Sequence, residues 1–320
     1  MLLTKVVKIV NMSKNCNFIG LFFLFGLFAS SCKSGKTISN ANNNTPNPSK
    51  LSKPFIEELK QKYPNENLVL VITTYGEMII RLFNETPLHR DNFVNLVEKK
   101  YYDSLLFHRV IKDFMVQGGD PDSKTADFNK MLGDGDVGYA VPAEFKKELF
   151  HKKGMICAAR EGDDINPTKV SSGCQFYIVQ GKKFTDESLK TVEYRINRPI
   201  LHQLTKEYLE TSGNEAIKAQ YERYQKEGMK DSLTALKKKI DIIIMPIYEA
   251  KEHHTFTEEQ KQVYKTIGGT PHLDGSYTVY GEVILGLDVV DRIAEKATGK
   301  NDRPLENVRM KMLMIQKINK

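Results

Sequence analysis

The segment of residues 107–121, FHRVIKDFMVQGGDP, constrains the fold and function of this chain more than any other. Because alternate side chains of an extended segment share a face, Arg109, Met115 and Gln117 fall on the same side. A bend near Asp113 would bring Phe114 alongside them, before the segment stops in a Gly-Gly-Asp-Pro turn. A cation, two large apolar side chains and a neutral amide on one concave surface suit a short, partly apolar peptide. They do not suit a phosphate group or a metal ion.

Strand and helix patterns flank this segment. Residues 69–83, VLVITTYGEMIIRLF, predict two strands around a Tyr-Gly-Glu turn. Thr86 and Pro87 provide a helix N-cap and a proline at the first helical position. Apolar residues recur at helical spacing after them, so a helix is expected near residues 87–98. A second helical segment is expected near residues 287–294.

Taken together, these motifs closely resemble the cyclophilins, the peptidyl-prolyl cis-trans isomerases. Residues 154–160 (GMICAAR), 172–178 (SGCQFYI) and 271–283 (PHLDGSYTVYGEV) look like the later core strands and pocket loop of that family. The resemblance extends from about residue 68 to the C-terminus, with one large interruption. It implies a mainly β fold, a closed antiparallel barrel of eight strands capped by two helices, which leaves no free sheet edge.

The resemblance also implies roles for individual residues. Arg109 occupies the position of the catalytic arginine, and Gln117 that of the glutamine which supports the arginine and the substrate backbone. No cofactor and no metal site are expected. The positions that match the walls, edge and rim of the substrate pocket are Phe114, Met115, Ala159, Arg160, Gln175, Tyr177, His272, Leu273 and Tyr277.

The chain departs from the best-known eukaryotic pattern of the family at several positions. Tyr277 stands where a histidine is usual, His272 where a tryptophan is usual, and Tyr177 where a phenylalanine is usual. Asp136 interrupts a Gly-rich loop around residues 133–135. These changes leave the arginine in place. Because an indole N–H donor and its large apolar face are missing, only weak binding of cyclosporin is expected.

The N-terminal region has the layout of a secretory signal, with lysines before the apolar segment of residues 18–28. That segment ends in Ala-Ser-Ser-Cys, which resembles the lipobox of bacterial lipoproteins. Residues 1–32 are therefore expected to be a lipoprotein signal peptide, with lipid attached to Cys32. An ordinary signal peptide with an incidental cysteine and an uncleaved anchor are the alternatives. Met12 is an alternative start that would give a signal of more usual length.

Residues 33–54 are rich in Ser, Asn, Thr, Pro, Gly and Lys and are expected to form a disordered tether before a domain of residues 55–320. The lipid would anchor the protein in a bacterial cell envelope, at the outer membrane and facing the periplasm. The net charge of +7 is spread over lysines scattered among glutamates. Nucleic acid is therefore not an expected partner.

Two cysteines, Cys157 and Cys174, lie in the expected core. The resemblance places them on strands that run near each other, so a disulfide is one interpretation. Two buried, unpaired thiols that act as small apolar residues are the favoured interpretation.

The interruption of the family pattern spans residues 183–268 and is mostly helical in character. Apolar residues fall near helical spacing in residues 194–209 and again in residues 217–236, with breaks at residues 212–214 and at Gly228. Residues 257–260, TEEQ, form a capping-box pattern that opens a third helix. The apolar, β-branched run of residues 240–246 is ambiguous. The insertion is either an appendage that packs on itself or an arm that grips clients or dimerises.

Two functions remain for such a chain. The first is an isomerase that accelerates rotation of X-Pro bonds in exported proteins through Arg109. The second is a module or chaperone that binds proline segments with little turnover and uses the insertion to hold clients. In both cases the partners are proline-containing polypeptides.

Overall fold

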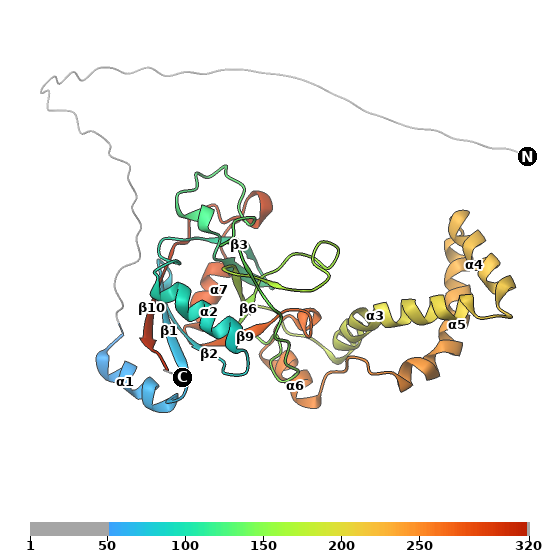
Figure 1. Ribbon diagram of the computed structural model, residues 1–320, viewed down its shortest axis with the longest axis horizontal. Coiled ribbons are helices and arrows are strands. Elements are labelled where there is room, and N and C mark those ends of the chain that lie inside the picture. Colours follow the sequence, from blue (N-terminus) through green and yellow to red (C-terminus); the bar gives the residue numbers. More distant parts are fainter. Residues whose placement is uncertain (1–50, 319–320) are drawn as a thin grey trace, which may run out of the picture. The chain divides into compact units, whose positions relative to one another are not determined.

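The structure is a computed structural model, and it describes residues 51–318 (Figure 1). The predicted signal peptide, the predicted lipid site at Cys32 and most of the predicted tether lie outside the described residues. No helix within residues 51–318 is both long enough and apolar enough to cross a membrane.

The centre of the fold is an antiparallel sheet of eight strands. Its order is β10-β1-β2-β9-β6-β8-β4-β3, and a separate small sheet pairs β5 with β7. The strands are β1 (Asn67–Thr73), β2 (Gly76–Leu82), β3 (Phe107–Ile111), β4 (Met115–Gly118), β5 (Ala140–Val141), β6 (Met155–Ala158), β7 (Ser171–Ser172), β8 (Phe176–Val179), β9 (Val279–Leu285) and β10 (Met310–Gln316).

The sheet curls into a half-barrel, and the predicted closed barrel is not confirmed. The strands at its two ends, β10 and β3, are not neighbours in the sheet. Within residues 51–318, the two edges pair over a short segment before and at the start of β3, where Leu106 forms an isolated bridge with Arg309 and Ser104 donates to the Met310 carbonyl. There the Phe107 N–H donates to the Val308 carbonyl at 2.9 Å. Barrel closure needs continuous pairing between the end strands, and here that pairing covers only a short segment.

The main core lies between the concave face of the sheet and two helices. Helices α2 (Pro87–Glu98) and α7 (Leu287–Ala294) begin and end where the sequence predicts. Phe93 of α2 and Val290 of α7 are buried in the same cluster as strand residues Val116 and Ile178. The two helices therefore cover the inner face, and the opposite side chains of the same strands are left to form the outer face.

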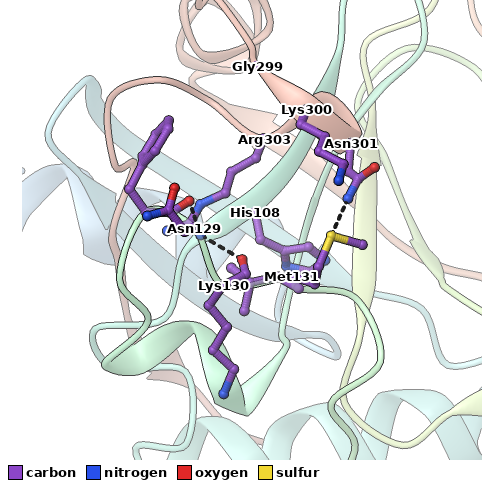
Figure 2. A pocket seen from close by; sticks show the side chains of 10 residues that line it. His108, Asn129, Lys130, Met131, Gly299, Lys300, Asn301 and Arg303 are labelled. Atoms are coloured by element: carbon purple, nitrogen blue, oxygen red, sulfur yellow. Dashed lines mark hydrogen bonds between the residues drawn. The ribbon is translucent and has the colours of Figure 1, made fainter.

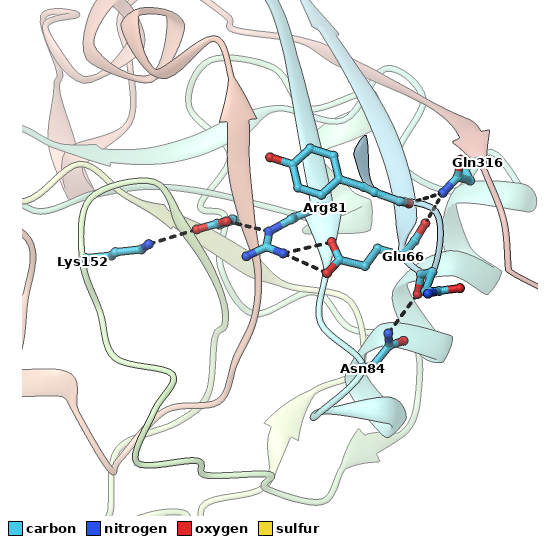
Figure 3. Close-up of polar contacts among 8 residues, drawn as sticks. Glu66, Arg81, Asn84, Lys152 and Gln316 are labelled. Carbon is cyan, nitrogen blue, oxygen red and sulfur yellow. Dashed lines mark hydrogen bonds and ion pairs between the residues drawn. The ribbon is translucent and has the colours of Figure 1, made fainter. Parts of the chain in front are cut away.

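Helix α1 (Lys53–Lys62) precedes the sheet and begins within the last two residues of the predicted tether. A polar network connects the segment after this helix to the sheet (Figure 3). Arg81 donates to Glu282 at 2.6 Å and to Glu66 at 2.8 Å, and Lys152 pairs with Glu282 at 3.1 Å. Gln316 donates to the Glu66 carbonyl at 2.8 Å. These contacts join the segment before β1, and the last strand β10, to β2 and β9.

The insertion between β8 and β9 folds as helices. They are α3 (Asp186–Glu210), α4 (Glu215–Lys226), α5 (Lys230–Ala250) and α6 (Glu258–Thr266), followed by the short 3₁₀ helix η2 (Pro271–Leu273). The predicted break at Gly228 and the capping box of Thr257 and Gln260 are confirmed. The ambiguous run of residues 240–246 lies inside α5, where Ile240 and Ile244 pack against Leu204 of α3.

Two further 3₁₀ helices, η1 (Pro121–Lys124) and η3 (Lys300–Asp302), lie outside the sheet. Both core cysteines, Cys157 and Cys174, are buried and unpaired, as the favoured interpretation predicted. Burial raises the pKa of both thiols, so they stay protonated at neutral pH.

Candidate active site

Four neighbouring strands place a row of side chains on the outer face of the sheet. Arg109 of β3 lies opposite Gln117 of β4, Gln117 lies opposite Tyr177 of β8, and Tyr177 lies opposite Cys157 of β6. Because side chains alternate along a strand, the residues between them enter the inner core instead. The turn between β3 and β4 requires Asp113 at φ +63°, which provides the bend that the sequence predicts.

The Arg109 side chain is oriented by two contacts and remains 43% exposed. Its Nε donates to Asp302 Oδ2 at 3.3 Å, and its Nη1 donates to Gln117 Oε1 at 3.5 Å. Both contacts are long, so they orient the guanidinium without engaging all of its donors. A half-exposed cation with free donors at the edge of a cleft can interact with a bound ligand.

A second glutamine holds Gln117 in place. Gln117 Nε2 donates to Gln175 Oε1 at 3.1 Å, and Gln175 Nε2 donates to the carbonyls of Gly133 and Gly135 at 2.7 and 2.8 Å. The close approach of residues 174–175 to the turn after β4 depends on Gly119, where φ is +103° and a Cβ atom would lie 2.3 Å from the Cys174 carbonyl. The Gly-Gly turn after β4 therefore gives Gln175 its place beside Gln117.

Beside the arginine lies an open cleft with about 470 Å³ of empty space, including open solvent. Its apolar residues belong to a satellite cluster on the outer face, separate from the main core. It is lined by Arg109, Phe114, Met115, Gln117, Ala159, Arg160, Tyr177, Leu273 and Tyr277. The cleft thus combines an apolar floor with one orientable cation, which suits a small apolar ring attached to a polar backbone.

One edge of the cleft is held by Arg160 and Tyr277. The Arg160 guanidinium lies 4.3 Å from the centre of the Tyr277 ring and donates to the Ser276 carbonyl at 2.8 Å. It also pairs with Asp163 at 2.7 Å. Because Nη1 also donates to the Glu161 carbonyl at 2.8 Å, every guanidinium nitrogen of Arg160 has a partner, and the residue supports this edge.

Two of the predicted site residues lie outside this cleft. Gln175 lines the adjoining groove, which holds about 1250 Å³ of empty space and shares Gln117, Ala159 and Arg160 with the cleft. His272 does not line the cleft but stacks on the ring of Phe114, with ring centres 5.5 Å apart. The structure thus places the predicted residues other than His272 in one cleft and one adjoining groove. His272 contacts the cleft through Phe114.

A separate cavity lies on the other side of β3 (Figure 2). His108 faces it because it is adjacent to Arg109 in the strand, and Arg303 donates from Nη1 to the Lys130 carbonyl at 2.9 Å. Lys300 and Asn301 of η3 line this cavity, while the next residue, Asp302, contacts Arg109. The turn at η3 therefore borders both the cavity and the cleft.

Comparison with known proteins decides the family. The model for "Cyclophilin type peptidyl-prolyl cis-trans isomerase/CLD" matches residues 68–192 and 187–314. The chain belongs to the cyclophilin-type peptidyl-prolyl cis-trans isomerases. A Staphylococcus aureus (strain COL) protein named as a peptidyl-prolyl cis-trans isomerase is 30% identical over 250 residues, which cover 78% of this chain and 91% of that protein.

Two further relatives differ in how much of each protein is matched. A Streptococcus pyogenes protein named as a bifunctional phosphatase and peptidyl-prolyl cis-trans isomerase is 29% identical over 75% of this isomerase and 37% of its own length. The crystal structure of a Cryptosporidium parvum cyclophilin type peptidyl-prolyl cis-trans isomerase has a TM-score of 0.46 and 17% identity, covering 79% of this isomerase and 99% of that chain.

Sequence reasoning missed two groups of this isomerase that contact the predicted residues. Asp302, the carboxylate beside Arg109, is 193 residues away in the chain. His151 lies behind the cleft and contacts the Tyr177 hydroxyl at 3.1 Å. No local pattern marks either residue, because each contact depends on how distant segments of the sheet pack.

Proposed function

We propose that this isomerase accelerates X-Pro rotation by non-covalent stabilisation of the twisted amide through Arg109. Rotation crosses a barrier of about 18–20 kcal/mol because the amide loses its resonance. Uncatalysed exchange takes roughly tens to hundreds of seconds. Exchange in milliseconds requires a barrier lower by about 6–7 kcal/mol. The protein must therefore bind the twisted amide better than either planar form.

A guanidinium meets this requirement directly. When the amide twists, the proline nitrogen becomes pyramidal and regains a lone pair that can accept a hydrogen bond. A donor of Arg109 aimed at this nitrogen interacts little with the planar amide and strongly with the twisted one, without any proton transfer. The observation that carries the proposal is the half-exposed guanidinium, oriented by Asp302 and Gln117 beside an apolar cleft.

The apolar walls supply the other half of the function. Phe114, Met115, Tyr177 and Leu273 would enclose the proline ring, and Gln117 would hold the peptide backbone beside Arg109. The groove that adjoins the cleft would hold the residues next to the proline, with Gln175 on its rim. Because the ring stays apolar throughout rotation, the walls bind all three forms, and only the polar groups distinguish the twisted amide.

An isomerisation assay on a short X-Pro peptide tests this proposal. Arg109→Ala is expected to lower kcat by roughly 100-fold or more with little change in KM, the pattern for a contact made in the transition state. Arg109→Lys is expected to restore little, since an ammonium lacks the planar fork of donors. Arg198→Ala, an exposed change on α3, is the matched control. Full activity in Arg109→Ala would contradict the proposal.

A second candidate function, holding of client chains by the insertion, is favoured by the surface of α5. Ile242, Ile243 and Ile247 are 75%, 49% and 50% exposed, while the alternate face of the helix packs inward. Adjacent exposed apolar residues of this kind often mark interaction sites. We propose that this face, residues Ile242, Ile243, Met245 and Ile247, binds apolar segments of unfolded clients.

Suppression of aggregation tests this second function separately from catalysis. Ile242→Gln combined with Ile247→Gln is expected to weaken suppression of aggregation of an unfolded, proline-containing protein and to leave peptide isomerisation unchanged. Leu305→Gln, a change at a 55% exposed residue outside the insertion, is the control. Equal suppression by all three proteins would exclude the α5 face as a client site.

We also propose that the clients are exported proteins and that lipid on Cys32 holds the domain at a bacterial outer membrane, facing the periplasm. The support is the lipobox-like sequence that ends at Cys32. Cys32→Ala is expected to release the full chain from the membrane fraction, and mass spectrometry of the wild-type protein is expected to find acyl groups on this residue. A wild-type chain without acyl groups would exclude the anchor.

A further inference from the structure

The base of the insertion is attached directly behind the proline cleft. The chain returns from the insertion at residues 268–270, where Gly269 forms bridges with both Lys152 and Lys182. The Thr270 N–H donates to the His151 carbonyl at 2.8 Å. A Cβ atom on Gly269 would lie 2.2 Å from that carbonyl, so only glycine permits this approach. The last helix of the insertion, α6, is therefore held against His151.

A chain of four side chains runs from α6 to the wall of the cleft. Tyr264 of α6 donates its hydroxyl to Asp274 Oδ2 at 2.7 Å. The other oxygen, Asp274 Oδ1, lies 2.8 Å from both the main-chain nitrogen and Nδ1 of His151. His151 Nε2 then lies 3.1 Å from the Tyr177 hydroxyl. Tyr264 and His151 are 0% exposed, Tyr177 is 4% exposed and Asp274 is 6% exposed.

The direction of each hydrogen bond follows from the chemistry of the groups. Burial raises the pKa of both phenols well above its usual value, so each keeps its proton. A carboxylate oxygen is the acceptor of a hydrogen bond with a ring nitrogen, so the proton between His151 and Asp274 is carried by Nδ1 of the histidine. Its Nε2 is then the acceptor for the Tyr177 hydroxyl. In this arrangement each hydrogen-bond donor among the four side chains has an acceptor.

Two walls of the cleft depend on this arrangement. Tyr177 lines the cleft with its ring and is tied to His151 by its hydroxyl. Leu273 lines it from the residue directly before Asp274. Loss of one buried donor leaves its acceptor without a partner, and the remaining groups must rearrange. A change at Tyr264 is therefore transmitted to the cleft, although Tyr264 does not line it.

We propose that Tyr264 is a positioning residue for the isomerase, which through Asp274 and His151 holds Tyr177 and Leu273 in place to bind the proline ring. The insertion is then in part a support of the active site, rather than only an appendage. This inference rests on the proposed role of the cleft as the proline site. Tyr264 belongs to helix α6 of the insertion, whereas Arg109 belongs to strand β3 of the sheet.

Substitution of the tyrosine by phenylalanine removes the hydroxyl and keeps the ring. Because the walls contact the proline in planar and twisted forms alike, Tyr264→Phe is expected to raise KM for an X-Pro peptide roughly threefold to tenfold with kcat nearly unchanged. Tyr194→Phe, on the exposed side of α3 in the same insertion, is the matched control and is expected to change neither. A lower midpoint of thermal unfolding with an unchanged KM would mean that Tyr264 contributes only to stability, which would overturn the proposal.

A double-mutant cycle and the ¹⁵N spectrum of His151 provide independent readouts. Tyr177→Phe is expected to raise KM as well, and the double variant is expected to show less than the product of the two effects. The His151 spectrum of the wild type is expected to show the Nδ1–H tautomer, and Tyr264→Phe is expected to alter it. Independent effects on KM and an unchanged spectrum would overturn the proposal. An inactive wild type would refute the proposed function alone, because the spectrum still tests the hydrogen-bond chain.

Discussion

At the scale of single residues, the proposed role of Arg109 depends on how weakly its side chain is restrained. Its contacts with Asp302 and Gln117 measure 3.3 and 3.5 Å, and both partners of the ion pair are about half-exposed. Such an exposed pair contributes little to stability. Its consequence is geometric, since it limits the directions in which the guanidinium can point while some donors stay available for the substrate.

A change at Asp302 tests this orienting role. Asp302 has φ +58°, a conformation that Asn tolerates, so Asp302→Asn keeps the turn and removes the charge. We expect kcat/KM to fall about twofold to fivefold, the range for loss of one exposed ion pair. Asp288→Asn, an exposed acid on α7, is the control. An increase in kcat/KM would mean that Asp302 restrains Arg109 instead of orienting it.

The residue at position 272 determines the expected response to cyclosporin. His272 stacks on Phe114 and offers neither an indole N–H nor a large apolar face. We expect weak inhibition of peptide isomerisation and stronger inhibition of His272→Trp. Sub-micromolar inhibition of the wild type, measured in the same assay, would contradict this expectation.

At the scale of elements, the insertion has two parts with separate cores. The base packs Leu189 and Val192 of α3 against Phe256 and Tyr264, while α3, α4 and α5 share a second cluster farther along. Between the two parts, Asn197 and His254 exchange hydrogen bonds of 2.8 Å in both directions. This reciprocal pair marks the place where the insertion can be shortened.

Excision of residues 199–252, with a short Gly-Ser linker joining the ends, tests whether the outer part of the insertion is independent of the cleft. Because the base and Tyr264 are retained, peptide isomerisation is expected to stay within about twofold of the wild type, as for independent sites. Removal of the whole of residues 183–268 deletes Tyr264 and is expected to raise KM at least as much as Tyr264→Phe. The assay is the same for both. Loss of peptide isomerisation in the shorter excision, with the domain still folded, would show that the outer part contributes to the cleft.

Sequence patterns predicted the helices that have a local signal. They did not determine the structure of segments whose conformation depends on tertiary packing. Helix α2 is marked in the sequence by Thr86, Pro87 and periodic apolar residues, and α7 by apolar residues at helical spacing, so their bounds were predictable. The run of residues 240–246 is β-branched and apolar, which suits a strand or a buried helix equally. Only the packing of Ile240 and Ile244 against α3 determines that it is helical.

The same distinction between local signals and tertiary contacts applies to the residues of the site. Alternation along one segment placed Arg109, Met115 and Gln117 on one face, and the family resemblance supplied their roles. Asp302 and Tyr264 come from distant segments and carry no local pattern, so only the folded chain brings them to the site. Closure of the barrel is also a property of distant strand edges, and the prediction of full closure was not confirmed.

At the scale of the whole molecule, a buried histidine couples stability to pH. Burial lowers the pKa of His108 to about 4, from an ordinary value of 6.5, and Arg109 and Arg303 contribute to the lowering while Asp120 opposes it. Between pH 6.5 and 4 the unfolded chain binds a proton at this residue that the folded chain does not bind. Stability therefore falls as the pH decreases from 6.5 to 4, by up to about 3 kcal/mol from this group.

Denaturant unfolding across this pH range measures the effect. His108→Gln is expected to flatten the decline in the free energy of unfolding between pH 6.5 and 4, whatever its effect at neutral pH. Part of the slope will remain, because burial also lowers the pKa of His89. His202→Gln, on an exposed position of α3, is expected to leave the slope unchanged. An equally steep decline in His108→Gln would assign the pH dependence to other groups.

The most direct test of the central claim is the exchange rate of an X-Pro peptide while it is bound. NMR exchange spectroscopy separates rotation on the protein from binding and release. We expect the Arg109→Ala variant to bind the peptide with an unchanged dissociation constant, and the exchange between cis and trans on the protein to slow by roughly 100-fold or more. Unchanged exchange in the bound peptide, with binding retained, would contradict the claim that Arg109 stabilises the twisted amide.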